Sequence, residues 1–78
     1  MEQQKLIEII AKSLNIPSGE IAATTSLSHE IGVDSIEMVT LCRNLTKTFN
    51  CNLNVAEIKE ADTVEKLFMY IEEKQKVS

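Results

Sequence analysis

The chain has 78 residues, of which 44% are hydrophobic, and this size allows one small domain with a thin core. A substrate domain beside a cofactor domain does not fit, so we expect one domain over residues 1–78 that is not an enzyme. Twelve acidic residues against eight basic ones give a net charge of -4. That charge opposes phosphate backbones and predicts no binding to nucleic acid.

No apolar stretch approaches the ~18 residues that would predict a membrane span. The first residues, MEQQKLIEII, lack the basic start and apolar core of a secretory signal, so we expect a cytoplasmic location. Cys42 and Cys51 should then stay reduced. Two cysteines and one histidine do not make a recognised four-ligand zinc pattern, and we expect no metal site.

The first predicted helix covers residues 2–14. Leu6, Ile10 and Leu14 recur in it at helical spacing. Asn15 and Pro17 follow and should end it, because proline disfavours helical geometry at the residue before it. Residues 15–33 form a long link, and the isoleucine and leucine side chains scattered through it predict that it is pinned to the core.

The second helix should begin at Asp34 or Ser35 and end at Phe49. Its predicted buried face comes from apolar residues at intervals of three or four, namely Ile36, Val39, Cys42, Leu45 and Phe49, with Leu41 at the flank. A short third helix is predicted over residues 55–60 and a fourth over residues 63–75, and we expect residues 76–78 to fray. The fold class is therefore all-α, a four-helix bundle with a long loop between helices 1 and 2.

Two stretches share the pattern Asp-x-x-Glu at a predicted helix start, DSIE at 34–37 and DTVE at 62–65. Each predicts a capping box, in which the aspartate and the glutamate bond the backbone of the first turn. DSIE differs because it ends the long link, where a hydroxyl on Ser35 would be exposed at the N-terminus of a long helix. That end favours a phosphate group, so Ser35 is a candidate phosphate-bearing residue, with simple helix capping as the alternative.

A catalytic role for Ser35 would require a nearby base. The only histidine, His29, lies six residues upstream and outside any hydrolase motif, so we interpret it as a solvated loop residue. Cys42 lies on the predicted apolar face of helix 2 and is interpreted as a core residue. Cys51 follows that helix, in a loop where exposure is expected.

The order of these elements, with EIGVDSIEMV before helix 2 and DTVEKLFMYI in helix 4, resembles the acyl carrier proteins over roughly residues 3–74. The family motif acidic-Leu-Gly-x-Asp-Ser-Leu is matched here by residues 30–36, with isoleucine at both leucine positions. The resemblance implies that Ser35 is esterified by 4'-phosphopantetheine, delivered from coenzyme A by a separate phosphopantetheinyl transferase. It implies that Asp34 helps this transferase to place its metal and the serine.

By the same resemblance, the thiol of the arm holds acyl groups as thioesters for loading ligases or transferases and for synthases. The bundle interior can shelter the acyl chain in this family. The positions that would line it here are Val39, Leu45, Leu53, Ile58, Ala61, Leu67 and Ile71, for which plain core packing is the alternative.

Family members that serve fatty acid synthesis usually carry a strongly acidic second helix. Here the expected partner contacts on that helix are Glu37, Met38, Thr40, Arg43 and Lys47, so two positive charges stand where the family favours acid. Reversed charge disfavours the usual partners. The interpretation is a monomeric carrier that serves enzymes of fatty acid, lipid or polyketide synthesis, as a specialised member rather than the housekeeping carrier of fatty acid synthesis. A peptidyl or aminoacyl carrier, or a helical interaction domain in which Ser35 only caps a helix, remain as alternatives.

Overall fold

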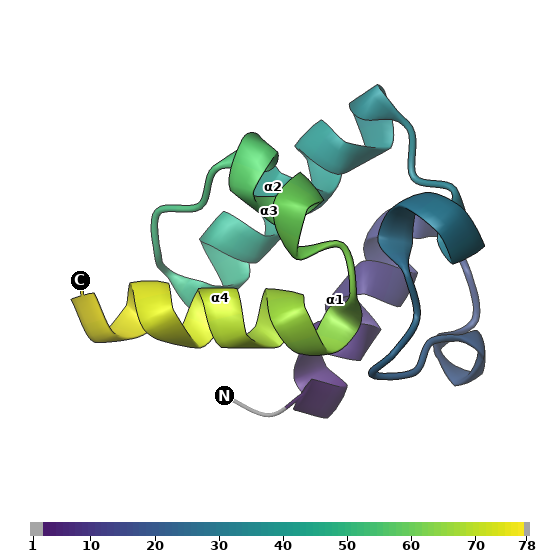
Figure 1. Ribbon diagram of the computed structural model, residues 1–78, viewed down its shortest axis with the longest axis horizontal. Coiled ribbons are helices and arrows are strands. Elements are labelled where there is room, and N and C mark those ends of the chain that lie inside the picture. The colour runs from purple at the N-terminus through teal and green to yellow at the C-terminus, as the bar shows by residue number, and fades with distance from the viewer. Residues whose placement is uncertain (1–2, 78) are drawn as a thin grey trace.

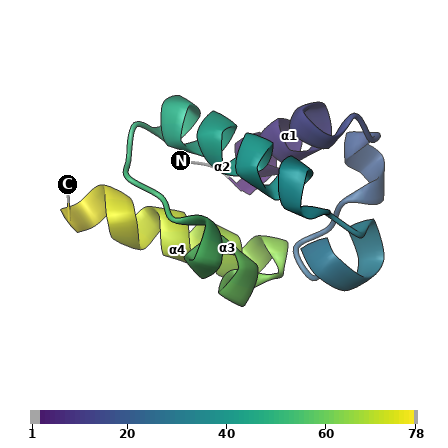
Figure 2. The same ribbon diagram turned by 90° about the horizontal axis from the view of Figure 1, so that it is seen from above.

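The computed structural model describes residues 3–77 and confirms an all-α fold. The bundle consists of α1 (Gln3–Leu14), α2 (Ser35–Phe49), α3 (Val55–Ala61) and α4 (Val64–Val77). Figure 1 shows α4 along one edge of the molecule with α2 and α3 beside it. Seen from above, α1 and α2 form one pair and α3 and α4 the other, with the link at one end of the bundle (Figure 2).

The predicted helix boundaries agree with the structure to within about two residues. Residue 2, where the first helix was predicted to begin, lies outside the described residues. Helix α4 extends two residues past its predicted end, to Val77. Fraying of residues 76–78 stays a prediction, and Ser78 lies outside the described residues. Asn15 ends α1 with a left-handed backbone (φ 57°), as its position predicted.

The core is built almost entirely from aliphatic side chains of the four helices and the link. The residues with no exposed surface are Leu6, Ile10, Leu27, Leu41, Leu45, Ile58, Val64, Leu67 and Ile71. Leu27 and the buried Ile21 belong to the link, which confirms that the link is pinned to the core. No helix within residues 3–77 is long and apolar enough to cross a bilayer.

The buried face of α2 differs from the predicted one. Ile36 and Val39 are 78% and 47% exposed, whereas Met38, Leu41 and Cys42 are buried. The predicted stripe was wrong at its N-terminal end because residues 36, 39, 42, 45 and 49 drift around the helix. At 3.6 residues per turn, Ile36 lies roughly 180° from Leu45. The true stripe starts at Met38 and continues through Leu41, Cys42, Leu45 and Phe49.

The link is wound into two short turns rather than being an open loop. The first, η1 (Ser18–Glu20), is a 3-10 turn, and the second, η2 (Leu27–Ile31), is a π-helical turn. Ser26 caps η2, its hydroxyl accepting from the His29 N–H at 3.0 Å. Gly32 ends η2 with φ 75°, and a Cβ on it would meet no atom within 4 Å. Glycine is therefore favoured here by the backbone angle and not by lack of space.

The DTVE stretch does not form a capping box, so that prediction was wrong. Asp62 ends α3 with φ 54°, and its carboxylate accepts from the Ser26 hydroxyl at 2.6 Å and from the Ser28 N–H at 3.0 Å. The first turn of α4 is capped instead by Thr63, whose hydroxyl accepts from the Lys66 N–H at 3.4 Å. Asp62 thus ties the link to the α3–α4 junction.

Candidate functional site

Ser35 is the first residue of α2, and its side chain is exposed. Asp34 precedes it as the N-cap. The Asp34 carboxylate accepts from the Glu37 N–H at 2.7 Å, and the Glu37 carboxylate accepts from the Asp34 N–H at 3.1 Å. The capping box predicted for DSIE is therefore confirmed. It fixes the direction of the chain on both sides of Ser35 while leaving the Ser35 hydroxyl uncovered.

The first turn of α2 also presents unused hydrogen-bond donors. The Asp34 carboxylate accepts a hydrogen bond from the Glu37 N–H, and the Asp34 backbone carbonyl accepts one from the Met38 N–H. Within the described chain, the N–H groups of Ser35 and Ile36 make no hydrogen bond. Together with the partial positive charge of a fifteen-residue helix, these donors suit a phosphate attached to Ser35. The carboxylates of Asp34 and Glu37 lie in the same turn and oppose that negative charge.

The surface beyond Ser35 is partly apolar and partly basic. Ile36 and Val39 are exposed on the outer side of α2, and Thr40, Arg43 and Lys47 are exposed further along the helix. Exposure of Ile36 was missed by the sequence reasoning. The angular distance of Ile36 from Leu45 was a signal that could have revealed it.

Two of the site residues were predicted on the wrong side of α2. Met38 was assigned to the partner surface, but it is 4% exposed and packs in the core. It lies on the same face of α2 as the buried Leu41 and Leu45. Val39 was assigned to the acyl-chain lining, but at 47% exposed it lies on the outer side of α2.

The other candidate lining residues do come together in the interior. Leu45, Ile58, Leu67 and Ile71 have no exposed surface, and Leu53 and Ala61 pack against them half-buried. They come from α2, α3, α4 and the α2–α3 connection. The arrangement shows core packing, and a role in holding an acyl chain stays a prediction.

The remaining reactive side chains do not converge on Ser35. His29 is exposed on η2, and no hydrogen bond joins it to Ser35 within residues 3–77. Cys42 is buried, as predicted, and its thiol donates to the Leu53 carbonyl at 3.6 Å. Cys51 was expected to be exposed but is 6% exposed, and burial raises the pKa of its thiol, with the Lys74 charge acting in the opposite direction. Among the described residues, no group of three or more potential ligands could hold a metal ion.

Comparison with known proteins points to a single family. Residues 4–71 match the family model for the phosphopantetheine attachment site. The chain is 31% identical to an acyl carrier protein of Porphyromonas gingivalis over 74 residues, which cover 95% of each chain. It is 28% identical to an acyl carrier protein of Aster yellows witches'-broom phytoplasma over 68 residues, covering 87% of this chain and 90% of the relative. An acyl carrier protein of Amoebophilus asiaticus is 25% identical over 71 residues, covering 91% and 89%.

The family-model match begins in α1, includes the link, α2 and α3, and ends within α4. The family consists of carriers and not of catalysts, and in this chain the serine of the predicted site is exposed. It implies a covalently attached 4'-phosphopantetheine and interaction with a phosphopantetheinyl transferase and with biosynthetic enzymes. On this evidence the chain belongs to the acyl carrier protein family.

Proposed function

We propose that Ser35 is the residue that carries the 4'-phosphopantetheine and that the chain delivers acyl intermediates to a dedicated set of enzymes. The single observation that carries this proposal is the placement of Ser35. It is an exposed serine at the first position of α2, directly after an aspartate cap, in a chain of the acyl carrier family. The arm supplies a thiol that holds acyl groups as thioesters, so the reactions take place on partner enzymes.

The residues around Ser35 support its attachment role by positioning it. The Asp34–Glu37 capping box holds the hydroxyl at the helix tip, and the unused N–H groups of Ser35 and Ile36 offer donors to an attached phosphate. We propose that Asp34, adjacent to the hydroxyl, also serves the transferase in placing its metal. Ile36 would then give the transferase an apolar contact beside the serine, since its side chain is 78% exposed.

A dedicated pathway in lipid or polyketide synthesis is proposed from the charges on α2. After Glu37, the charged residues on this helix are Arg43 and Lys47, and both are exposed. A partner with a basic docking patch would meet like charges there, which slows association and costs affinity. We propose Glu37, Thr40, Arg43 and Lys47 as partner contacts in a cytoplasmic, monomeric carrier.

Intact-protein mass spectrometry tests the attachment site. The purified chain is incubated with a broad-range phosphopantetheinyl transferase and coenzyme A. We expect the native chain to gain one phosphopantetheinyl group and Ser35→Ala to gain none. Ser18→Ala, which removes another exposed serine of the link, is the matched control and should be modified like the native chain. An unmodified native chain would instead support a helical interaction domain in which Ser35 is only the first residue of α2, behind the Asp34 cap.

Acyl transfer from the modified chain tests the pathway. General fatty acid enzymes should act on it more slowly than on a carrier with an acidic second helix, and Arg43→Glu with Lys47→Glu should narrow the difference. Equal rates for the native chain and the acidic-helix carrier would refute the dedicated role. Loading with amino acids rather than carboxylic acids would point to an aminoacyl carrier.

A further inference from the structure

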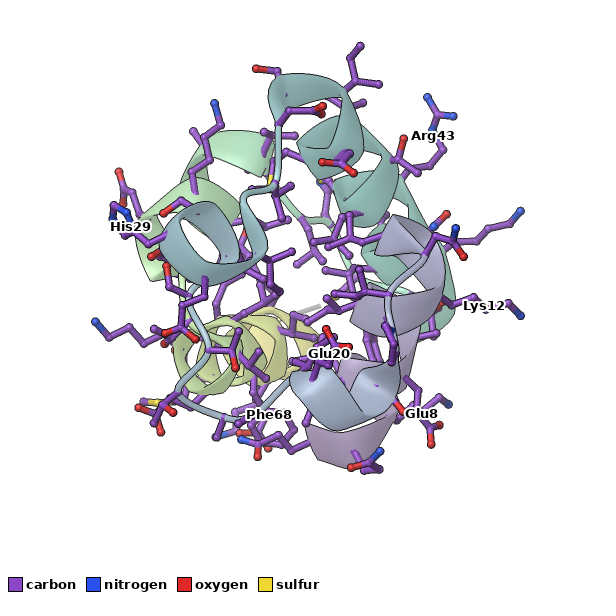
Figure 3. All side chains as sticks on the ribbon, turned by 90° about the vertical axis from the view of Figure 1, so that its right-hand side faces the viewer. Glu8, Lys12, Glu20, His29, Arg43 and Phe68 are labelled. Atoms are coloured by element: carbon purple, nitrogen blue, oxygen red, sulfur yellow. The ribbon has the colours of Figure 1, made fainter. Side chains whose placement is uncertain are left out.

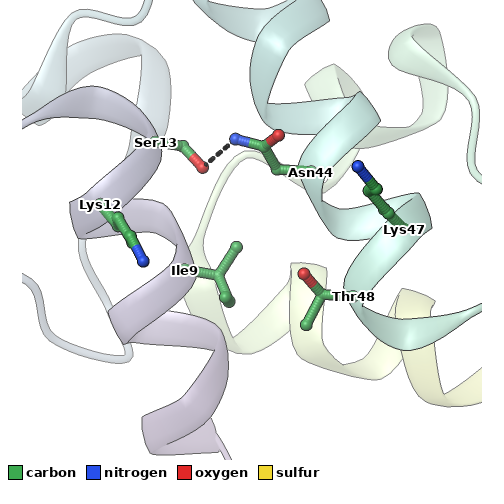
Figure 4. A pocket seen from close by; sticks show the side chains of 6 residues that line it. All are labelled: Ile9, Lys12, Ser13, Asn44, Lys47 and Thr48. Carbon is green, nitrogen blue, oxygen red and sulfur yellow. Dashed lines mark hydrogen bonds between the residues drawn. The ribbon is translucent and has the colours of Figure 1, made fainter.

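A groove runs between α1 and α2, away from Ser35 and on the side opposite α3 and α4. Its volume is about 260 Å³, and its lining residues are Ile9, Lys12, Ser13, Asn44, Lys47 and Thr48. Figure 4 shows Ile9 and Thr48 facing one another across it. At one end the Asn44 amide donates to the Ser13 hydroxyl at 2.8 Å, which ties the two helices together there. The groove is therefore a feature of the α1–α2 packing.

The charge of this groove is positive although the chain as a whole is acidic. Its lining contains two lysines and no carboxylate. Lys12 and Lys47 are exposed and take part in no ion pair within residues 3–77. Arg43 lies one turn before Lys47, and Figure 3 shows Arg43 and Lys12 projecting on the same side of the molecule, with His29 on the other. Two cations therefore line the groove, and a third lies one turn away on α2.

Most acidic residues lie elsewhere, and Glu8, one turn before Lys12 on α1, is the carboxylate nearest the groove in sequence. Helices α1 and α2 carry only Glu8 and Glu37 as described acidic residues. The other described carboxylates belong to the link, the α2 cap, α3 and α4, at Glu20, Glu30, Asp34, Glu57, Glu60, Asp62, Glu65, Glu72 and Glu73. The chain has a net charge of -4 but an uneven charge distribution, with basic residues on the α1–α2 side. The electric field of these residues would orient an approaching acidic partner toward that side.

The dimensions and the placement of the lysines indicate the kind of ligand. Pockets for small molecules usually enclose about 300–1,000 Å³, and this groove is smaller and open. Figure 4 shows the amino groups of Lys12 and Lys47 on opposite sides of the groove rather than converging on one point. A single small anion would contact only one of them. Two carboxylates separated by an apolar side chain would match both lysines and place the apolar group between Ile9 and Thr48.

We propose that this α1–α2 groove is a second docking surface, which binds an acidic segment of a partner enzyme through Lys12 and Lys47 and an apolar side chain through Ile9. It engages α1 as well as α2 and lies apart from the turn that bears Ser35. Binding at the groove does not depend on modification of Ser35, so the two proposals can fail separately. Attraction between exposed charges should make the contact weak and sensitive to salt.

The test uses a synthetic acidic peptide as the probe. The peptide places glutamates on both sides of a leucine in one helical repeat, and a glutamine version serves as the uncharged control. Amide shifts of the isotopically labelled full chain are followed by NMR during titration at low salt. We expect the shifts to be largest at Lys12, Ser13, Asn44 and Lys47, to weaken as salt is added, and to be absent with the glutamine peptide.

Two double variants separate a local contact from net charge. Lys12→Glu with Lys47→Glu should weaken binding by about tenfold or more, since each exposed pair is replaced by like-charge opposition. Lys59→Glu with Lys66→Glu changes the net charge equally on α3 and α4, where both lysines are exposed, and should bind within about twofold of the native chain. Circular dichroism checks that each variant is folded, and Lys12→Gln with Lys47→Gln replaces the first pair if it is not.

The proposal is overturned if the peptide shifts amides on another face, if both double variants weaken binding equally, or if the native chain does not bind. Each variant is also treated with the transferase and coenzyme A and its mass measured. Modification of Ser35 without peptide binding would refute the groove alone. Peptide binding without modification would refute the proposed function and leave the groove supported.

Discussion

Replacing Asp62 with alanine should release the link from the α3–α4 junction. The Asp62 carboxylate accepts from the Ser26 hydroxyl at 2.6 Å and from the Ser28 N–H at 3.0 Å. A hydrogen bond to a charged group contributes about 1.5–3 kcal/mol. Because Asp62 is only half-buried, we take the lower end of that range for each bond and expect the two bonds together to contribute about 3 kcal/mol. Alanine at φ 54° keeps the positive-φ backbone that Asp62 already has, so the lost hydrogen bonds account for the expected change.

Urea unfolding followed by far-ultraviolet circular dichroism measures this loss. In a domain of this size, each kcal/mol should also lower Tm by about 4–8 °C. Asp62→Gly is the matched control: it loses the same hydrogen bonds but relieves the positive-φ backbone, so it should be destabilised less than Asp62→Ala. A double-mutant cycle with Ser26→Ala should give a coupling of about 1 kcal/mol or more. An Asp62→Ala chain within about 0.5 kcal/mol of the native one would refute the reasoning.

The same contact predicts how stability depends on pH. The hydrogen bond from Ser26 and those from Ser28 lower the pKa of Asp62, against a smaller effect of burial. A carboxyl whose pKa is lower in the folded chain contributes stability that is complete above its unfolded pKa, near 4, and is lost as pH falls through the folded value. The stability difference between the native chain and Asp62→Asn should therefore shrink below about pH 4. A difference that stays constant through the acid range would contradict this assignment.

Two further predictions concern Asp34 and Tyr70. Asp34→Ala removes the α2 cap and should lower the free energy of unfolding by about 0.5–2 kcal/mol in urea, and an unchanged midpoint would show that the capping box contributes little. Tyr70 donates to the Glu57 carboxylate at 2.7 Å. Burial is the main cause that raises the pKa of Tyr70 to about 12, and the bond to Glu57 and the Glu57 charge raise it further, whereas the hydrogen bond from the Asn54 N–H lowers it. Ultraviolet absorbance should show Tyr70 ionising near pH 12, and at a lower pH in Glu57→Gln. The free energy of unfolding should fall as pH rises from about 10 toward 12, because the phenol pKa is higher in the folded chain. Ionisation of Tyr70 at an ordinary phenol pKa would contradict this environment.

The helices of this chain could be predicted because their signals are local. Asn15 and Pro17 mark the end of α1, and the capping pattern at Asp34 marks the start of α2. The capping box at Ser35 needed nothing beyond its own turn and was confirmed. Ser35 stood out as a candidate for the same reason, since an exposed hydroxyl at a helix start follows from the pattern alone.

Contacts between distant segments were harder to predict than the helices. The buried stripe of α2 failed for a local reason instead: Ile36 lies roughly 180° from Leu45, so the helical period alone indicated that Ile36 is exposed. The prediction that the link is pinned was confirmed, but not which residue holds it: Asp62, more than thirty residues away from Ser26, bonds its π-helical turn. The α1–α2 groove likewise combines Lys12 and Lys47 from two helices, so neither helix alone reveals it.

The two Asp-x-x-Glu stretches show why one pattern has two outcomes. Among residues 3–77, the Asp34 carboxylate accepts a hydrogen bond only from the Glu37 N–H in its own turn, and it caps α2. Asp62 meets the Ser26 hydroxyl and the Ser28 N–H, and its left-handed backbone ends α3 instead of opening α4. Asp62 therefore fixes the link at residues 26–28, and Asp34 fixes the first turn of α2, which begins with Ser35. A serine held between these two anchors can be exposed and still have a defined position, because its placement depends on the backbone and not on burial of its side chain.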